Sequence, residues 1–136
     1  MSYNVIDIEG IGHNYAERLK AKCGISTTDE LLEKGATKRG REKIADETEI
    51  PESLILTWVN HADLFRIKGV AGQFSELLEA AGVDSVKEFA TRNPDNLHAK
   101  LMQTNDEFGL SGKVPSVESL KAMIDHAKTL DPRISH

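Results

Sequence analysis

The sequence predicts an all-α protein in which two tandem helical repeats pack as one compact domain with pseudo-two-fold symmetry. Three observations support this prediction. Apolar residues recur with a helical period, and no segment shows the sustained alternation with β-branched residues that is typical of strands. Residues 8–19 match residues 67–78 in order. Glycine and proline fall where helices are expected to end or begin.

The internal match extends beyond these two segments. With a one-residue gap, Gly24-Ile25 aligns with Gly82-Val83, and weaker pairs continue in the same order along both halves of the chain. We interpret this as a duplication. It predicts a first repeat at residues 1–65 and a second at residues 66–136, with one shared core.

The expected helices follow from hydrophobic period and punctuation. They span residues 13–23, 28–34, 37–48, 52–65, 72–81, 85–92, 94–104 and 116–130. Thr28 and Ser85 are expected N-caps. The helix at 52–65 is apolar around most of its circumference, so we expect it in the interior, between the repeats. The helix at 116–130 is expected to fold back against residues 8–12 and close the pseudo-two-fold.

Composition and charge narrow the classes of function. The chain has 136 residues, 39% hydrophobic and 29% charged, and a formal net charge of −5. That charge weighs against coating nucleic acid with the whole surface, because such binding depends on neutralising phosphates. No run approaches the roughly 18 apolar residues of a membrane helix, and the first residues lack a signal-peptide pattern. The single cysteine, Cys23, cannot form an internal disulfide, so we expect a cytoplasmic protein and a packing role for the thiol.

One motif carries a physical mechanism. Residues 8–19 read Ile-Glu-Gly-Ile-Gly-His-Asn-Tyr-Ala-Glu-Arg-Leu and fit the pattern apolar-x-Gly-apolar-Gly-x-x-x-Ala-x-x-Leu. This pattern resembles the helix-hairpin-helix motif. Glycine accepts positive φ and has no Cβ, so the turn is tight, and the helix that follows begins with unpaired N–H groups suited to an anion. Ile11 is the expected inward anchor, and Ala16 allows close helix packing.

The resemblance implies two tandem helix-hairpin-helix repeats that contact nucleic-acid phosphate without regard to base sequence. It also implies that hairpin carbonyls can hold a monovalent cation; no other cofactor is expected. The second copy departs from the pattern, since Ala71 replaces the second glycine and Ser75 replaces the alanine. Gly72, one residue later, compensates in part. A purely structural role stays open for both hairpins.

Longer segments carry a second resemblance. They are Ile8–Leu19, the basic Gly35–Arg41, Leu54–Val70 and Leu77–Leu101. On these segments the chain is similar to the bacterial domain-of-unknown-function family 4332, over roughly residues 5–130. The resemblance supports the tandem architecture and implies no activity or catalytic residues.

Basic residues gather between positions 34 and 43, where Glu42 is the one acid. They could hold phosphates beside the first hairpin, or simply form a solvated face. We expect Ala36, Gly40 and Ile44, spaced by four, to form the packed side of this helix. The predicted nucleic-acid-binding residues are Gly10, Ile11, Gly12, His13, Asn14, Arg18, Lys38, Arg39, Arg41, Lys43, Lys68, Gly69 and Gly72.

The remaining candidates point away from catalysis. No nucleophile–base pair, P-loop or metal-ligand cluster is recognisable, so we predict a protein that is not an enzyme and holds no metal. His61 and His126, at equivalent repeat positions, are each expected to hydrogen-bond to a backbone carbonyl.

Two functions stay open. The first is sequence-independent DNA binding, favoured by the Gly-Ile-Gly turn and the basic cluster. The second is a protein-interaction adaptor or self-associating helical repeat, favoured by the acidic balance and the imperfect second hairpin. Neither hypothesis involves a membrane or a small-molecule substrate.

Overall fold

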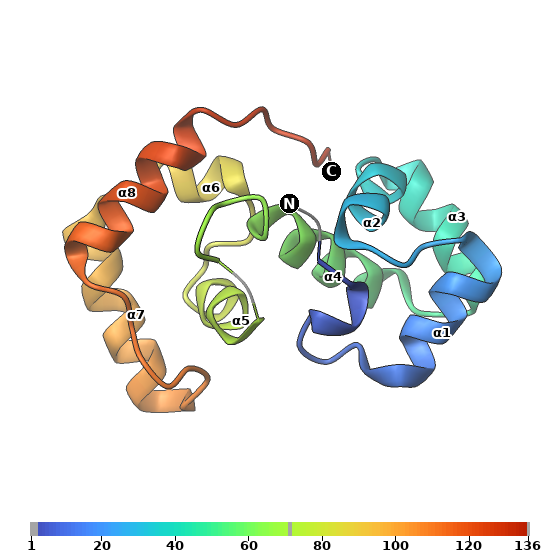
Figure 1. Ribbon diagram of the computed structural model, residues 1–136, viewed down its shortest axis with the longest axis horizontal. Coiled ribbons are helices and arrows are strands. Elements are labelled where there is room, and N and C mark those ends of the chain that lie inside the picture. Colours follow the sequence, from blue (N-terminus) through green and yellow to red (C-terminus); the bar gives the residue numbers. More distant parts are fainter. Residues whose placement is uncertain (1–2, 71, 136) are drawn as a thin grey trace. The chain divides into compact units, whose positions relative to one another are not determined.

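The computed structural model describes residues 3–70 and 72–135. Within these ranges the regular structure is helical, apart from one isolated bridge between Asn4 and Thr27. Its elements, in chain order, are η1 (Val5–Asp7), α1 (Gly12–Cys23), α2 (Thr28–Gly35), α3 (Lys38–Thr48), α4 (Glu52–Leu64), α5 (Gly72–Ala80), α6 (Val86–Ala90), α7 (Pro94–Phe108) and α8 (Val117–Lys128) (Figure 1). The predicted all-α class is confirmed.

The chain divides into two compact units. Unit 1 comprises residues 1–63 and 133–136, and unit 2 comprises residues 64–132. Each unit is described by itself below. The shared core and the pseudo-two-fold arrangement stay predictions. None of the described helices has the length and apolar character needed to cross a membrane.

Unit 1 is built around the packing of α3 against α1 and α2. The rings of Tyr15 on α1 and Trp58 on α4 lie 5.1 Å apart between centroids. Gly35, at the end of α2, lies so close to Val59 that a Cβ there would come within 2.5 Å of the valine methyl group. The buried apolar residues of this unit include Val5, Ile8, Ile11, Leu19, Ile25, Leu31, Ile44, Ile55 and Val59.

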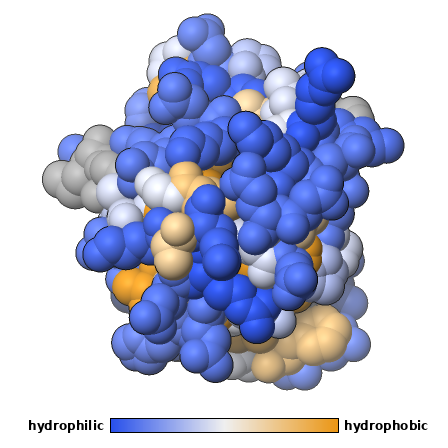
Figure 2. All heavy atoms as spheres, turned by 90° about the vertical axis from the view of Figure 1, so that its right-hand side faces the viewer, coloured by the Kyte–Doolittle hydropathy of each residue, from blue (hydrophilic) through white to orange (hydrophobic). Residues whose placement is uncertain are grey.

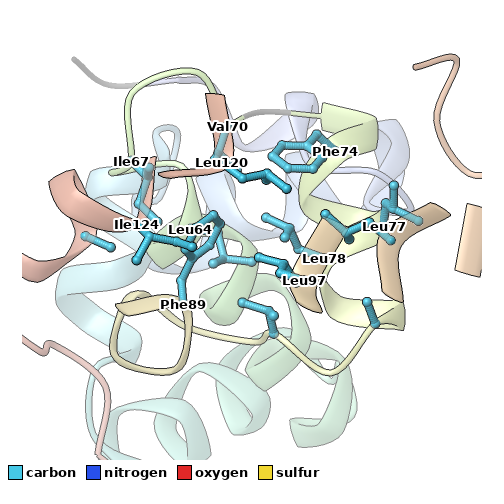
Figure 3. Packing of buried hydrophobic residues seen from close by; sticks show 14 of the residues in the cluster. Leu64, Ile67, Val70, Phe74, Leu77, Leu78, Phe89, Leu97, Leu120 and Ile124 are labelled. Carbon is cyan, nitrogen blue, oxygen red and sulfur yellow. The ribbon is translucent and has the colours of Figure 1, made fainter. Parts of the chain in front are cut away.

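Unit 2 has a continuous apolar core. Helix α8 packs against α6 and α7, and α5 packs against α7. The side chains that meet there include Leu64, Ile67, Val70, Phe74, Leu77, Leu78, Phe89, Leu97, Leu120 and Ile124 (Figure 3). This core fixes the start of the unit, because Ile67 and Val70 flank the second glycine turn and are 1% and 0% exposed.

Helix α4 is buried on all sides over its C-terminal half, since every residue from 58 to 65 is buried. The prediction that this helix lies in the interior is confirmed for this half only, because residues 52–57, apart from Ile55, are exposed or half-buried. Its position between the repeats stays a prediction, as does the closure of α8 against residues 8–12.

Local signals set most helix ends. Gly24 and Gly82 have φ values of +68° and +94°, positive values that glycine accepts readily after a helix. Ser85 caps α6 as predicted, accepting from the Glu88 amide. The N-cap of α2 is Thr27, one residue before the predicted Thr28.

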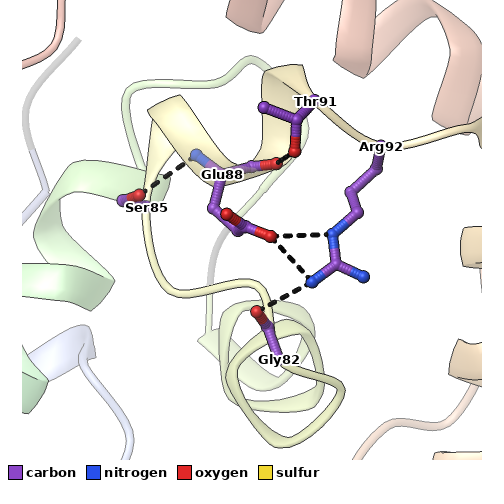
Figure 4. Close-up of polar contacts among 5 residues, drawn as sticks. All are labelled: Gly82, Ser85, Glu88, Thr91 and Arg92. Carbon is purple, nitrogen blue, oxygen red and sulfur yellow. Dashed lines mark hydrogen bonds and ion pairs between the residues drawn. The ribbon is translucent and has the colours of Figure 1, made fainter.

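In each unit, a basic side chain donates a hydrogen bond to a backbone carbonyl at or just after the end of a helix, α1 in unit 1 and α5 in unit 2. In unit 2, Arg92 Nη2 donates to the carbonyl of Gly82 at 3.0 Å and pairs with Glu88 at 2.9 Å (Figure 4). In unit 1, Lys34 Nζ donates to the carbonyl of Cys23. A cation at these carbonyls opposes the negative end of the helix dipole.

Candidate nucleic-acid interface

The first turn, residues 8–12, has the backbone that the sequence pattern predicts. Gly10 and Gly12 adopt φ values of +90° and +67°, which L-residues with a side chain rarely adopt. The Ile11 amide donates to the Ile8 carbonyl at 3.3 Å, and both isoleucine side chains are buried. A Cβ on either glycine would meet nothing within 4 Å. The turn therefore needs these glycines for their dihedral angles and not for space.

Helix α1 begins directly at this turn without a side-chain cap. Ile11 precedes the helix and accepts no capping hydrogen bond from it, and the first turn of α1 contains no acid. The first amides of a helix have no partner within the helix, and its dipole places positive charge there. His13 and Asn14 are exposed at this end, and so is Glu9 in the turn itself. Apart from Glu9, the arrangement suits an anion.

The second turn, residues 67–70, is closed in the same way. The Val70 amide donates to the Ile67 carbonyl at 3.1 Å, as Ile11 does to Ile8. Gly69 has a φ of +92° and Gly72 a φ of +46°. Ala71, which replaces the second glycine of the pattern, lies outside the described ranges. Gly72 supplies positive φ at the start of α5, the place that Gly12 has at the start of α1.

The second turn differs because one of its amides is already bonded to a side chain. The Lys68 amide donates to Nδ1 of His126, on α8, at 3.2 Å. The prediction that His126 bonds to a carbonyl is therefore wrong, since Nδ1 accepts from an N–H. For His61, a hydrogen bond to a backbone carbonyl stays a prediction. His126, Lys68, Gly69 and Met123 help to line a mainly apolar pocket of about 400 Å³.

Arg41 does not belong to the exposed basic surface that the sequence predicts. Its side chain is buried, at 2% exposure, and Nη1 donates to the Gly35 carbonyl at 2.9 Å. Burial lowers the pKa of the guanidinium, against the opposing effect of Glu52 and Glu42.

Helix α3 buries Arg41, Ile44 and Thr48. The predicted packed side is thus wrong for Ala36, which follows α2, whereas Gly40 is half-buried and packs against the Lys34 carbonyl.

The other predicted basic residues of unit 1 are exposed. Lys38, Arg39 and Lys43 project from α3, and Arg18 projects from α1. Arg18 bridges the two helices, since Nη1 donates to the Thr48 carbonyl at 3.4 Å. The structure thus places these residues in unit 1 with the first turn, whereas Lys68, Gly69 and Gly72 lie in unit 2. The face of unit 1 drawn in Figure 2 is mainly hydrophilic.

Two lysines outside the predicted set share a pocket with Lys43. They are Lys22, from the last turn of α1, and Lys34, from the last turn of α2. Lys34 belongs to the basic run between positions 34 and 43, and Lys22 lies four residues after Arg18. That spacing puts Lys22 and Arg18 on the same face of α1 and was the signal that could have identified Lys22.

Comparison with known proteins gives one match. The family model described as Domain of unknown function (DUF4332) matches residues 9–130, which include both glycines of the first turn, the second turn and α1 to α8. Neither a curated protein nor a solved structure matches the chain.

Proposed function

The chain belongs to the DUF4332 family, and we propose that its first unit binds duplex DNA through the phosphate backbone, without regard to base sequence. The observation that carries this proposal is the exposed first turn, in which Gly10 and Gly12 lead into the uncapped start of α1. Backbone amides contact phosphate oxygens and not base edges, so such a contact positions a protein without reading sequence.

Exposed cations on the same unit support this role. Arg18 on α1 and Lys38, Arg39 and Lys43 on α3 are exposed, and α1 contacts α3. Because the whole chain carries a net charge of −5, binding would be local. Because it neutralises phosphates, it would weaken as the salt concentration rises.

The proposal assigns binding to the first turn and not to the second. In the second turn, the Lys68 amide is bonded to His126. In the first turn, a Cβ on either glycine would meet no neighbouring atom, so this surface is open to a ligand.

The test is fluorescence anisotropy with random-sequence duplex DNA at about 50 mM salt. An acid at the second helical position should repel phosphate while favouring the helix through its dipole. His13→Glu on α1 should therefore abolish most of the binding, and Gln73→Glu, at the same helical position on α5, is the matched control. The proposal fails if micromolar protein does not bind, or if both variants weaken binding equally.

The mainly apolar pocket beside the second turn supports a second candidate, self-association or binding of another protein through unit 2. Ala122 is exposed and lines this pocket. If this candidate holds, wild type should form a dimer or larger species in light scattering coupled to size exclusion, and Ala122→Glu should be monomeric. Monomeric wild type at high concentration would exclude self-association.

A further inference from the structure

We infer that unit 1 carries a lysine-lined pocket that binds a phosphate group through side-chain ammonium groups. The pocket measures about 350 Å³ and receives one lysine from each of three helices: Lys22 from α1, Lys34 from α2 and Lys43 from α3. This site goes beyond the proposed function, because it shares only Lys43 with it, adds Lys22 and Lys34, and does not require the first turn to bind anything.

The charge in the pocket is positive. Its lining contains three lysines and one acid, Glu47. Glu47 lies 3.9 Å from the ammonium of Lys43 and accepts a hydrogen bond from the Cys23 thiol at 3.2 Å. One carboxylate cannot balance three ammonium groups, so the pocket attracts an anion with more than one charge.

The acid one turn before Lys34 is engaged by backbone amides. Glu30 accepts from the amides of Ser26 and Thr27, both at 3.0 Å, and these bonds lower the pKa of its carboxyl. In unit 2, by contrast, the acid one turn before the corresponding cation forms a 2.9 Å ion pair with it, between Glu88 and Arg92. The acid thus pairs with the cation in unit 2, whereas in unit 1 the Lys34 ammonium donates one hydrogen bond to the Cys23 carbonyl and has further N–H groups for a ligand.

Helix capping alone does not explain the three lysines. Lys22 and Lys34 stand in the last turns of their helices, where cations oppose the helix dipole. Lys43 stands in the middle of α3 and has no carbonyl of that kind to oppose. Gly40 forms part of the lining, and any Cβ there would overlap the Lys34 carbonyl oxygen. The pocket wall is thus bare backbone at this point.

The ligand chemistry follows from the donors. Lysine ammonium groups act on phosphate as point charges and do not impose the planar geometry of arginine. The pocket therefore suits a phosphate-bearing anion with two or more charges. Such a group could come from a free polyphosphate or nucleotide, or from the backbone of a nucleic-acid strand.

A neighbouring hollow extends from this pocket along α1 and is lined by Asn14, Glu17, Arg18, Ala21 and Lys22. Residues 14, 18 and 22 are spaced by four and share one face of the helix. Because α1 has 12 residues, its length is about 18 Å, so one strand could contact the turn and the pocket together.

Cys23 gives a local measure of occupancy, because this single cysteine lines the pocket. The experiment follows alkylation of Cys23 in the full chain by iodoacetamide, at constant ionic strength, using mass spectrometry. Inorganic triphosphate in one arm, and a short DNA duplex in the other, are the probes. Triphosphate at ten times its Kd should slow the reaction by about tenfold.

Three variants test whether protection of Cys23 comes from binding in this pocket or from a general attraction of anions to surface lysines. Lys22→Gln and Lys43→Gln should each lose most of the protection, compared with their own rates without ligand. Lys20→Gln should keep it, because Lys20 lies in the same last turn of α1 but borders a different hollow. If neither triphosphate nor the duplex protects Cys23, or if Lys20→Gln and Lys22→Gln keep equal protection, the proposal is overturned.

The two arms identify the source of the phosphate. Protection by triphosphate alone indicates a free phosphate ester, whereas protection by the duplex as well indicates a strand. His13→Glu should leave protection by triphosphate unchanged, so a failure of the first turn to bind DNA is distinguishable from a failure of this pocket.

Discussion

The guanidinium of Arg41 donates from Nη2 to the carbonyl oxygen of Ser135 at 2.7 Å, across 94 positions of sequence. The Ser135 amide in turn donates to the Ala36 carbonyl at 2.8 Å. Nη1 of Arg41 donates to the carbonyls of Gly35 and Ala36. One buried cation therefore binds both the end of α2 and the segment that follows α8. Its partners here are carbonyl dipoles and not carboxylates.

Replacing Arg41 should destabilise unit 1. Arg41→Met leaves the carbonyls of Gly35, Ala36 and Ser135 without this donor, and hydrogen bonds to charged groups contribute about 1.5–3 kcal/mol each. We expect a loss of about 2–4 kcal/mol in the free energy of unfolding, measured by urea denaturation. Ser135→Pro removes the amide donor and should cost about 1 kcal/mol, whereas Ser135→Ala keeps that amide and should cost less. An unchanged urea midpoint for Arg41→Met would contradict this assignment.

Two helical glycines should resist replacement by alanine because they lack space. In Gly35→Ala, the new Cβ would lie 2.5 Å from Cγ2 of Val59. In Gly40→Ala, it would overlap the backbone carbonyl of Lys34, which cannot rotate away. Overpacking costs about 1–3 kcal/mol, and we expect Gly40→Ala to be the worse of the two. Gly112→Ala is the control, since a Cβ there meets nothing within 4 Å; it should leave the thermal midpoint unchanged or raise it.

The Cys23 thiol should react slowly at neutral pH. Burial raises its pKa to about 11, and the hydrogen bond to Glu47 and the charge of that carboxylate act in the same direction. Because the thiolate is the reactive form, the alkylation rate should climb with pH until about pH 11. Glu47→Gln removes the charge and should lower the pKa of the thiol, so the same curve should shift to lower pH. If the wild-type alkylation rate instead levels off near the ordinary pKa of a thiol, the Cys23 thiol is not buried beside Glu47 in solution.

The hydrogen bond between Lys68 and His126 should protect one amide of the second turn from exchange. His126→Ala removes the acceptor, so the Lys68 amide should exchange with solvent deuterium faster than in wild type. His126→Asn can place an oxygen near the position of Nδ1 and should restore part of the protection. Equal Lys68 exchange rates in wild type and His126→Ala would show that the bond is not maintained in solution.

Local sequence signals were sufficient for the helices but not for every boundary. Helix α7 continues to Phe108, beyond the predicted end at residue 104, because Gly109 supplies its left-handed cap. The Asn105 side chain then bonds to the backbone of Ser111 in both directions, at 2.9 Å each. The cap of α2 could have been predicted, since Thr27 and Glu30 have the spacing of a capping box.

The candidate site was harder to predict because exposure depends on distant partners. The turn at Gly10 and Gly12 is local, and its dihedral angles follow from the pattern. Arg41 looks like its basic neighbours in sequence, yet one of the carbonyls that it binds belongs to residue 135. Lys22, Lys34 and Lys43 come from three helices, and only their packing brings them to one pocket. The partner of Lys68, at position 126, is likewise distant in sequence.

The two glycines of the first turn should not vary equally among relatives of this chain. Gly12, with a φ of +67°, lies in the left-handed region that asparagine and aspartate also visit. Gly10, at +90°, lies beyond that region, as does Gly69 at +92°. Among relatives, asparagine should therefore occur at position 12, whereas positions 10 and 69 should stay glycine. The backbone dihedral angles set this difference, because a Cβ at Gly10 or Gly12 would meet no neighbouring atom.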